Sequence, residues 1–152
     1  MLLYCDASAL VKVYLTEDHT EAVRRRIVAA DVVATHAVAY VEARSALARR
    51  RSAGDLPAPA HDEALALIDA DWSRWAVVPM DERRAGQLAA RHGLRALDAV
   101  HLAAALALRE AGPEATLSFC TFDERQLAAA QAEGLLALGP DEGVAGAAPP
   151  AP

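Results

Sequence analysis

Short apolar runs alternate with longer amphipathic stretches along most of the chain. The short runs are mostly apolar on both faces and end at turn or charged residues, as buried parallel strands do. They predict strands at 2–5, 32–35, 76–79, 117–120 and 135–138. The longer stretches follow a helical period and predict helices near 8–15, 19–30, 37–52, 59–73, 82–92, 98–111 and 124–133. This alternation predicts one α/β domain, with a mostly parallel five-stranded sheet that helices flank on both faces.

Several boundaries of these elements are marked by residue type. Asp81 is an N-cap candidate for the helix at 82–92. The Gly-Pro pair at 112–113 ends the helix at 98–111. The segment 54–59 predicts a turn between two helices rather than a linker between domains. Residues 140–152 are rich in Gly, Pro and Ala and show no period, so we expect a domain at 1–139 followed by a tail.

Composition narrows the class of protein. The 152 residues are 54% hydrophobic but only 5% aromatic, so a single core must rest on aliphatic side chains. Cys5 and Cys120 lie in apolar segments, and two thiols make neither a disulfide framework nor a zinc site, so we expect both to be buried and reduced. The first residues lack the basic region of a signal peptide, and no apolar run approaches a membrane span. We therefore expect a cytoplasmic protein.

Acidic residues stand where ligands gather in a sheet of this kind, at the carboxyl ends of strands. Asp6 follows the first predicted strand, Asp123 follows the fourth, and Asp98 opens the long helix before the fourth. Glu42 lies within the helix at 37–52. Apolar contacts on one side of that helix are expected from Val38, Val41 and Leu47. Because carboxylate oxygens are ligands for Mg²⁺ and Mn²⁺, and such ions activate water against phosphodiesters, the set predicts a divalent-cation site.

Each acidic residue has a simpler explanation when it is taken alone. An Asp that precedes a helix is commonly its N-cap, and a Glu within a helix is commonly a solvated surface residue. His101 lies one turn after Asp98 and could carry a proton, but packing against an apolar neighbour is the more common role of a helix histidine. Position along the chain therefore suggests an acidic site without deciding its function.

Four segments resemble the motifs of PIN domains, a family of metal-dependent nucleases. The segment 4–12 resembles the first motif, a strand that ends in Asp-x-Ser, and 40–47 resembles the second, a helix with a glutamate. The segment 93–103, GLRALDAVHLA, resembles the third very closely and is the most specific signal in the chain. The segment 119–123 resembles the fourth, a strand that leads into Thr-x-Asp. Order and spacing agree from residue 2 to about 138, and the length resembles the VapC toxins of bacterial toxin–antitoxin pairs.

The resemblance implies a Mg²⁺-dependent endoribonuclease, with Mn²⁺ as an alternative ion. It assigns catalysis and metal binding to Asp6, Glu42, Asp98 and Asp123. The first and third of these would be the principal ligands, and the other two would bind through water or complete a second metal position. Supporting roles fall to Ser8, which would orient the Asp6 carboxylate, and to Thr121.

The net charge opposes binding of RNA at long range. Fifteen basic and 21 acidic residues give −6. Four of the negative charges belong to the predicted site, where divalent ions would largely neutralise them. Arg49 lies two helical turns after Glu42 on nearly the same face, and Arg95 shortly precedes Asp98, so both are candidate contacts to RNA phosphates.

The resemblance also implies partners, namely an RNA substrate, a VapB-like antitoxin and a second copy in a homodimer. A basic residue from a flexible antitoxin tail would pair with the carboxylates. Apolar residues of that tail would pack near Val11, Tyr14 and Leu15, unless this stripe is simply core. The sequence identifies neither the RNA and its cleavage site, nor the antitoxin, nor the number of metal ions.

Other functions stay open at this point. A housekeeping PIN nuclease without an antitoxin, or a catalytically silent PIN-like interaction module, would share the fold. The complete acidic set disfavours the silent module, because four crowded carboxylates repel one another without a cation. A phosphoryl-transfer domain with an aspartate nucleophile needs a second Asp near the first and a Lys at a later strand end, whereas Lys12, in the first helix, is the only lysine.

Overall fold

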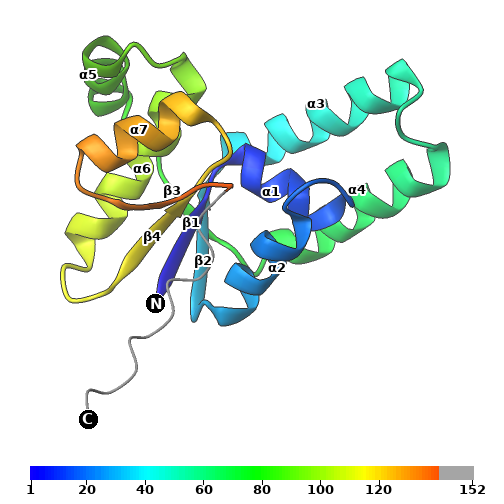
Figure 1. The fold of residues 1–152 in the computed structure, drawn as a ribbon, viewed down its shortest axis with the longest axis horizontal. Coiled ribbons are helices and arrows are strands. Elements are labelled where there is room, and N and C mark those ends of the chain that lie inside the picture. The colour runs from blue at the N-terminus through cyan, green and yellow to red at the C-terminus, as the bar shows by residue number, and fades with distance from the viewer. Residues whose placement is uncertain (141–152) are drawn as a thin grey trace.

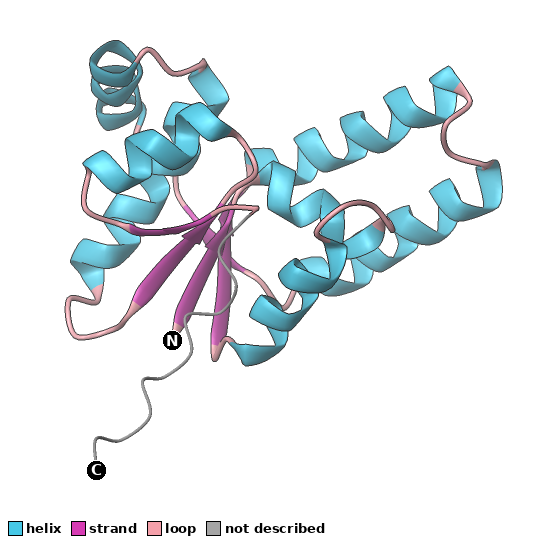
Figure 2. Cartoon of the chain, in the orientation of Figure 1, coloured by secondary structure: helices cyan, strands magenta, loops and turns pink. Residues whose placement is uncertain are grey.

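The computed structural model describes residues 1–140, so the predicted tail lies, apart from its first residue, outside the described residues. Five strands form one sheet in the order β3-β2-β1-β4-β5, and all four pairings are parallel (Figures 1 and 2). The strands are β1 (Leu2–Cys5), β2 (Val32–His36), β3 (Ala76–Val78), β4 (Leu117–Cys120) and β5 (Leu136–Leu138). The prediction of a mostly parallel five-stranded sheet is thus confirmed.

The helices begin and end within two residues of the predicted positions. They are α1 (Ala7–Tyr14), α2 (Thr20–Ala29), α3 (Val38–Ala53), α4 (Ala58–Trp72), α5 (Glu82–His92), α6 (Ala96–Ala111) and α7 (Glu124–Ala132). Asp81 caps α5 as expected, since its side chain accepts from the backbone N–H of Arg84. The turn after α3 is shorter than predicted, because Pro59 already lies in the first turn of α4, where a missing N–H costs nothing.

Helices cover both faces of the sheet. On one face, Tyr4 and Phe119 pack against apolar residues of α5, α6 and α7. On the other face, Cys5 and Cys120 lie with residues of α1 and α2, and both thiols are free and buried, as expected. Within the described residues, no helix combines the length and the apolar character needed to cross a membrane.

The α3–α4 hairpin projects from one side of the sheet and packs against α1 (Figure 1). The inner face of α3 carries Ala39, Ala43 and Leu47, which are spaced by four residues and are at most 1% exposed. The prediction that Val41 also packs inward is wrong, since its side chain is 67% exposed. Val41 lies two residues after Ala39 and is therefore rotated by about 200° around the helix, to the outer face.

The strand order places the topological switch point between β1 and β4. The chain passes outward from β1 to β2 and β3 on one side, and from β4 to β5 on the other. Ligands of open parallel sheets bind at the carboxyl ends of the strands beside such a point. Asp6 directly follows β1 and Thr121 directly follows β4, so two of the predicted site residues flank it.

Candidate active site

Asp6 is both the N-cap of α1 and a buried site residue, with 4% of its surface exposed. Its carboxylate accepts from the Ala9 N–H at 2.9 Å and from the Thr121 hydroxyl at 2.8 Å, and the Ser8 hydroxyl lies 2.7 and 2.9 Å from its two oxygens. Burial raises the pKa of Asp6, and the nearby His101 and these hydrogen bonds offset burial only in part. Ser8 therefore orients Asp6, as the resemblance implied, and the structure shows that Thr121 does so as well. The protein thus holds a carboxylate that is poorly solvated.

Gln126 connects Thr121 to the start of α6. Its side-chain oxygen lies 2.7 Å from the Thr121 hydroxyl, and its amide donates to the backbone carbonyl of Asp98 at 3.0 Å. Sequence reasoning missed this fully buried residue. The available signal was its place three residues after the N-cap Asp123, where a Gln is typical of a capping box. Here its side chain points to neighbouring elements instead of back to the cap.

Asp98 and Asp123 are held together by Arg95. The guanidinium donates to Asp98 at 2.7 Å through Nε and to Asp123 at 2.8 Å through Nη2. The pKa of Arg95 is raised, first by the hydrogen bond to Asp98 and then by the charges of Asp98, Asp123 and Glu42. Asp98 is not an N-cap, since Arg95 occupies that position, but it lies in the first turn of α6, where the helix dipole favours a carboxylate. In this arrangement Arg95 faces carboxylates, and its contact to RNA phosphate stays a prediction.

Glu42 is drawn toward the sheet by His101. The Nε2 atom of His101 lies 2.9 Å from Glu42 Oε2, and the Nδ1 atom lies 2.9 Å from the hydroxyl of Tyr4. His101 is 2% exposed. The simpler expectation of apolar packing for His101 is therefore incomplete, because both of its ring nitrogens have polar partners.

His36 is a further residue at this edge that sequence reasoning missed. It ends β2, and its Nδ1 accepts from the Val38 N–H at 3.1 Å. Burial lowers the pKa of His36, so the ring is neutral and its proton lies on Nε2. Among residues 1–140, this Nε2 is the one buried side-chain nitrogen or oxygen without a hydrogen-bond partner. The signal was its position beside the end of a predicted strand, the same rule that selected Asp6.

The four predicted carboxylates are thus linked at one edge of the sheet by the imidazole, guanidinium and hydroxyl groups that lie between them. His101 acts on both Asp6 and Glu42, and Arg95 joins Asp98 to Asp123. Within residues 1–140, no three His, Cys, Asp or Glu side chains form a group that could hold a metal ion as they stand. The all-oxygen donor set fits a hard divalent cation in its chemistry. Because the Arg95 side chain is 71% exposed, it can turn into solvent and leave the oxygens of Asp98 and Asp123 open.

A basic pocket of about 320 Å³ adjoins Glu42. Its lining includes Ser8, Lys12, Glu17, Glu42, Arg49, Arg50 and Phe122. The predicted placement of Arg49 on the Glu42 side of α3 is therefore confirmed. The Lys12 ammonium lies 4.7 Å from the centre of the Phe122 ring and 2.9 Å from a Glu17 oxygen. Burial alone would raise the pKa of Glu17, but hydrogen bonds from Lys12 and Arg50 lower it overall. The pocket therefore keeps three cations beside two carboxylates.

Comparison with known proteins decides the family. The model of the PIN domain family matches residues 3–132, which covers most of the chain and all four acidic positions. The chain belongs to the PIN domain family. This PIN domain is 36% identical over 140 residues to Ribonuclease VapC45 of Mycobacterium tuberculosis (strain CDC 1551 / Oshkosh) and to Ribonuclease VapC49 of M. tuberculosis (strain ATCC 25618 / H37Rv). Each match covers 88% of this chain and 92% of the relative, so the predicted resemblance to VapC-like PIN ribonucleases is confirmed.

Solved structures share the fold of this PIN domain. PAE2754 from Pyrobaculum aerophilum superposes with a TM-score of 0.64 at 20% identity, covering 93% of both chains. FitAcB from Neisseria gonorrhoeae superposes with a TM-score of 0.59 at 16% identity, covering 92% of this chain and 98% of that chain. At these identities the likeness supports the architecture alone.

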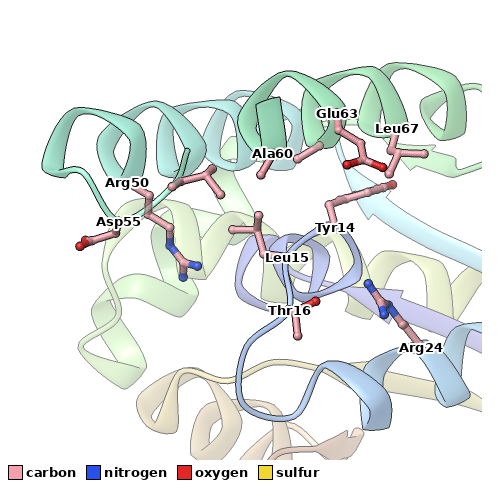
Figure 3. A pocket seen from close by; sticks show the side chains of 11 residues that line it. Tyr14, Leu15, Thr16, Arg24, Arg50, Asp55, Ala60, Glu63 and Leu67 are labelled. Atoms are coloured by element: carbon pink, nitrogen blue, oxygen red, sulfur yellow. The ribbon is translucent and has the colours of Figure 1, made fainter. Parts of the chain in front are cut away.

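This PIN domain has a larger pocket of about 730 Å³ between α1 and the α3–α4 hairpin (Figure 3). Tyr14 and Leu15 lie on one side of it, and Glu63 and Leu67 of α4 lie opposite. The predicted apolar stripe therefore contributes to both the core and the pocket. Val11 and Leu15 are buried in the core, as the simpler interpretation expected, while Tyr14 and Leu15 also line the pocket.

Proposed function

We propose that this chain is a metal-dependent endoribonuclease and the toxin of a VapBC-type pair. The observation that carries the proposal is that His101 faces Asp6 and Glu42 while Arg95 joins Asp98 to Asp123, which links four acidic residues from separate segments of a PIN domain. They are Asp6, Glu42, Asp98 and Asp123. The names of its relatives, which are 36% identical over most of their length, support ribonuclease activity.

Mg²⁺, with Mn²⁺ as the alternative, would be held chiefly by Asp6 and Asp98. Glu42 and Asp123 would bind it through water or complete a second metal position. A bound ion supplies an activated water and stabilises the charge that develops on the phosphodiester. The chain itself orients Asp6 through Ser8 and Thr121, and the Phe122 N–H in turn fixes Ser8 at 2.8 Å.

RNA in a single-stranded or looped form suits the basic pocket beside Glu42. Arg49, Arg50 and Lys12 supply positive charge for phosphates, and Phe122 lines the pocket beside them. A local group of cations next to the acidic residues answers the difficulty that the net charge of −6 poses for RNA binding.

Cleavage assays with purified protein test this proposal. Wild-type protein should cut single-stranded or loop RNA with Mg²⁺ or Mn²⁺ and stop when EDTA is added. Asp6→Asn and Asp98→Asn should abolish cutting, because each removes ligand charge with little change of shape. Asp62→Asn, at an exposed position of α4, is the matched control and should cut normally. Full activity in both site variants would refute the site, and metal binding without cleavage of any RNA would favour the silent interaction module.

The proposed antitoxin would use two surfaces. Apolar residues of its tail would enter the pocket beside Tyr14 and Leu67, and a basic residue would reach the carboxylates. Expression of the chain alone should slow bacterial growth, and co-expression with the product of an adjacent small gene should restore it. Harmless expression of a chain that cuts RNA in vitro would favour the housekeeping nuclease. The homodimer stays a prediction, which light scattering checks.

A further inference from the structure

A buried chain of hydrogen bonds connects the sheet to Glu42. It runs from the Tyr4 hydroxyl in β1 to Nδ1 of His101 in α6, and from Nε2 of His101 to the Glu42 carboxylate in α3. Both distances are 2.9 Å, and Tyr4 and His101 are at most 2% exposed. This series of hydrogen bonds joins three elements that are far apart in the sequence.

Chemistry fixes the direction of the hydrogen bond to Glu42. A carboxylate only accepts, so His101 carries a proton on Nε2 and donates it to Glu42. The Tyr4 hydroxyl can donate to Nδ1 or accept from it, so it anchors the imidazole at 2.9 Å while the Nε2–H faces Glu42.

Tyr4 is itself held firmly. Its ring stacks on Phe119 of β4 at a centroid distance of 5.5 Å, and neither residue is exposed. The imidazole is therefore fixed by a side chain that cannot move without disturbing the core.

Glu42 differs from the other three acidic residues in what restrains it. Asp6 and Asp123 are N-caps with short side chains, and Asp98 is held by Arg95 and the first turn of α6. Glu42 has a longer side chain, which is 26% exposed, and it lies in the early turns of α3. Within residues 1–140, His101 is the one hydrogen-bond partner of its carboxylate. Without that bond the carboxylate would sample several rotamers and lose its aim toward the site.

We propose that His101 is a positioning residue of the nuclease, which holds the Glu42 carboxylate in its working orientation and is itself locked by Tyr4. This inference rests on the proposed function, because it assigns a role within the same site. It also gives a reason for a buried polar chain where an apolar side chain would pack as well. Hydrogen-bond partners of ligating groups typically contribute about 10- to 100-fold to affinity or activity.

A pair of amide variants tests the role of the Nε2 proton. His101→Gln places an N–H donor near the position of Nε2, whereas the shorter Asn in His101→Asn reaches only the position of Nδ1. His101→Asn should lower kcat about 10- to 100-fold with little change in the KM for RNA, and should weaken Mn²⁺ binding in calorimetry. His101→Gln should retain most of the wild-type kcat and most of the Mn²⁺ affinity.

His92→Asn is the matched control. The Nε2 atom of His92, the last residue of α5, makes a similar contact, at 2.7 Å, to Glu133 at the end of α7. Figure 1 shows α5 on the opposite side of the molecule from the α3–α4 hairpin that carries Glu42. His92→Asn should leave kcat and Mn²⁺ binding unchanged. If His101→Asn folds poorly, Tyr4→Phe tests the same chain, because it removes only the hydroxyl, and it should lower kcat without changing KM.

A double-mutant cycle with Glu42→Gln separates positioning from general stability. If His101 acts through Glu42, adding His101→Asn to Glu42→Gln should cause no further loss of kcat. A full further loss in that background, or equal losses in the Gln and Asn variants that follow the melting temperature, would overturn the inference. If the wild type neither cuts RNA nor binds Mn²⁺, the proposed function fails. If it does both and His101→Asn matches it, only the role of His101 fails.

Discussion

At the scale of single residues, Asp6 and Arg95 show two ways of holding charge among the acidic residues. Asp6 is buried, and three hydrogen-bond donors compensate for only part of the lost hydration. Arg95 is largely exposed and neutralises Asp98 and Asp123 from the solvent side. A divalent cation would relieve the first residue and displace the second, so the two respond to metal in opposite ways.

Asp6→Asn should raise the melting temperature of the metal-free protein at neutral pH. Burial raises the folded-state pKa of Asp6 above the unfolded value of about 3.9, so its contribution to stability is lost as the pH rises through the folded pKa. The gain from the variant should be largest above that pKa and should vanish as the pH falls toward about 3.9. Thermal unfolding with EDTA at several pH values checks this. A gain that does not depend on pH would contradict it.

Arg95→Gln should tighten the binding of Mg²⁺, because it removes a cation that competes for Asp98 and Asp123. An exposed ion pair contributes up to about 1 kcal/mol, so the apparent Kd should fall by up to about fivefold. Calorimetric titration measures it. Arg91→Gln, which loses a similar pair with Glu133, removes the same charge elsewhere and should leave the Kd unchanged. Weaker binding in Arg95→Gln would show that Arg95 assists the ion.

At the scale of elements, α3 both packs into the core and carries Glu42 to the acidic residues. Its inner face packs small residues and Leu47 against α1 and α4, and its early turns also carry Glu42 toward His101. Small alanines let α3 approach its neighbours closely. The position of Glu42 at the site therefore depends on how this helix packs, as well as on its own hydrogen bond.

Leu47→Ala should destabilise the fold by about 2–5 kcal/mol, since it leaves a cavity in the core between α1, α3 and α4. Val41→Ala on the same helix should change stability by less than about 0.5 kcal/mol, because Val41 is exposed. Urea denaturation of both variants measures the difference. Equal effects would mean that the hairpin does not contribute to the cooperative core.

At the scale of the whole molecule, charge is unevenly arranged. The chain carries −6, yet Lys12, Arg49 and Arg50 stand together beside Glu42. Coulomb forces between exposed charges decay over about 8 Å at physiological salt, so RNA that entered this pocket, as proposed, would sense the local cations more than the distant acidic residues.

Arg49→Gln should weaken the binding of single-stranded RNA and reduce its dependence on salt. If the arginine neutralises one phosphate, its removal should lower the slope of log K against log salt by about 0.7. Fluorescence anisotropy in the Asp98→Asn background, which prevents cleavage, measures both quantities. Arg74→Gln removes the same charge from an arginine outside the basic pocket and serves as the control. An equal effect of both variants would point to net charge instead of a local interaction.

The sequence by itself determined the elements, the sheet type and the family. Apolar period and capping residues are local properties, so strands and helices were predicted to within two residues, and Asp81 was identified as a cap. The motif around Asp98 carries its chemistry within a dozen residues, which is why the acidic set could be selected without a structure.

Only the tertiary structure decided which groups face each other. Tyr4 and His101 are 97 residues apart, and His101 and Glu42 are 59 apart, so their contacts depend on strand order and helix packing. The same holds for Gln126 and for the bridge that Arg95 makes to Asp123 across 28 residues. Val41 was misplaced because a helical face is chosen by the neighbours that pack on it, and alanines could fill that face as well as valine. A side chain's partner is set by the distances between elements, which no local pattern encodes.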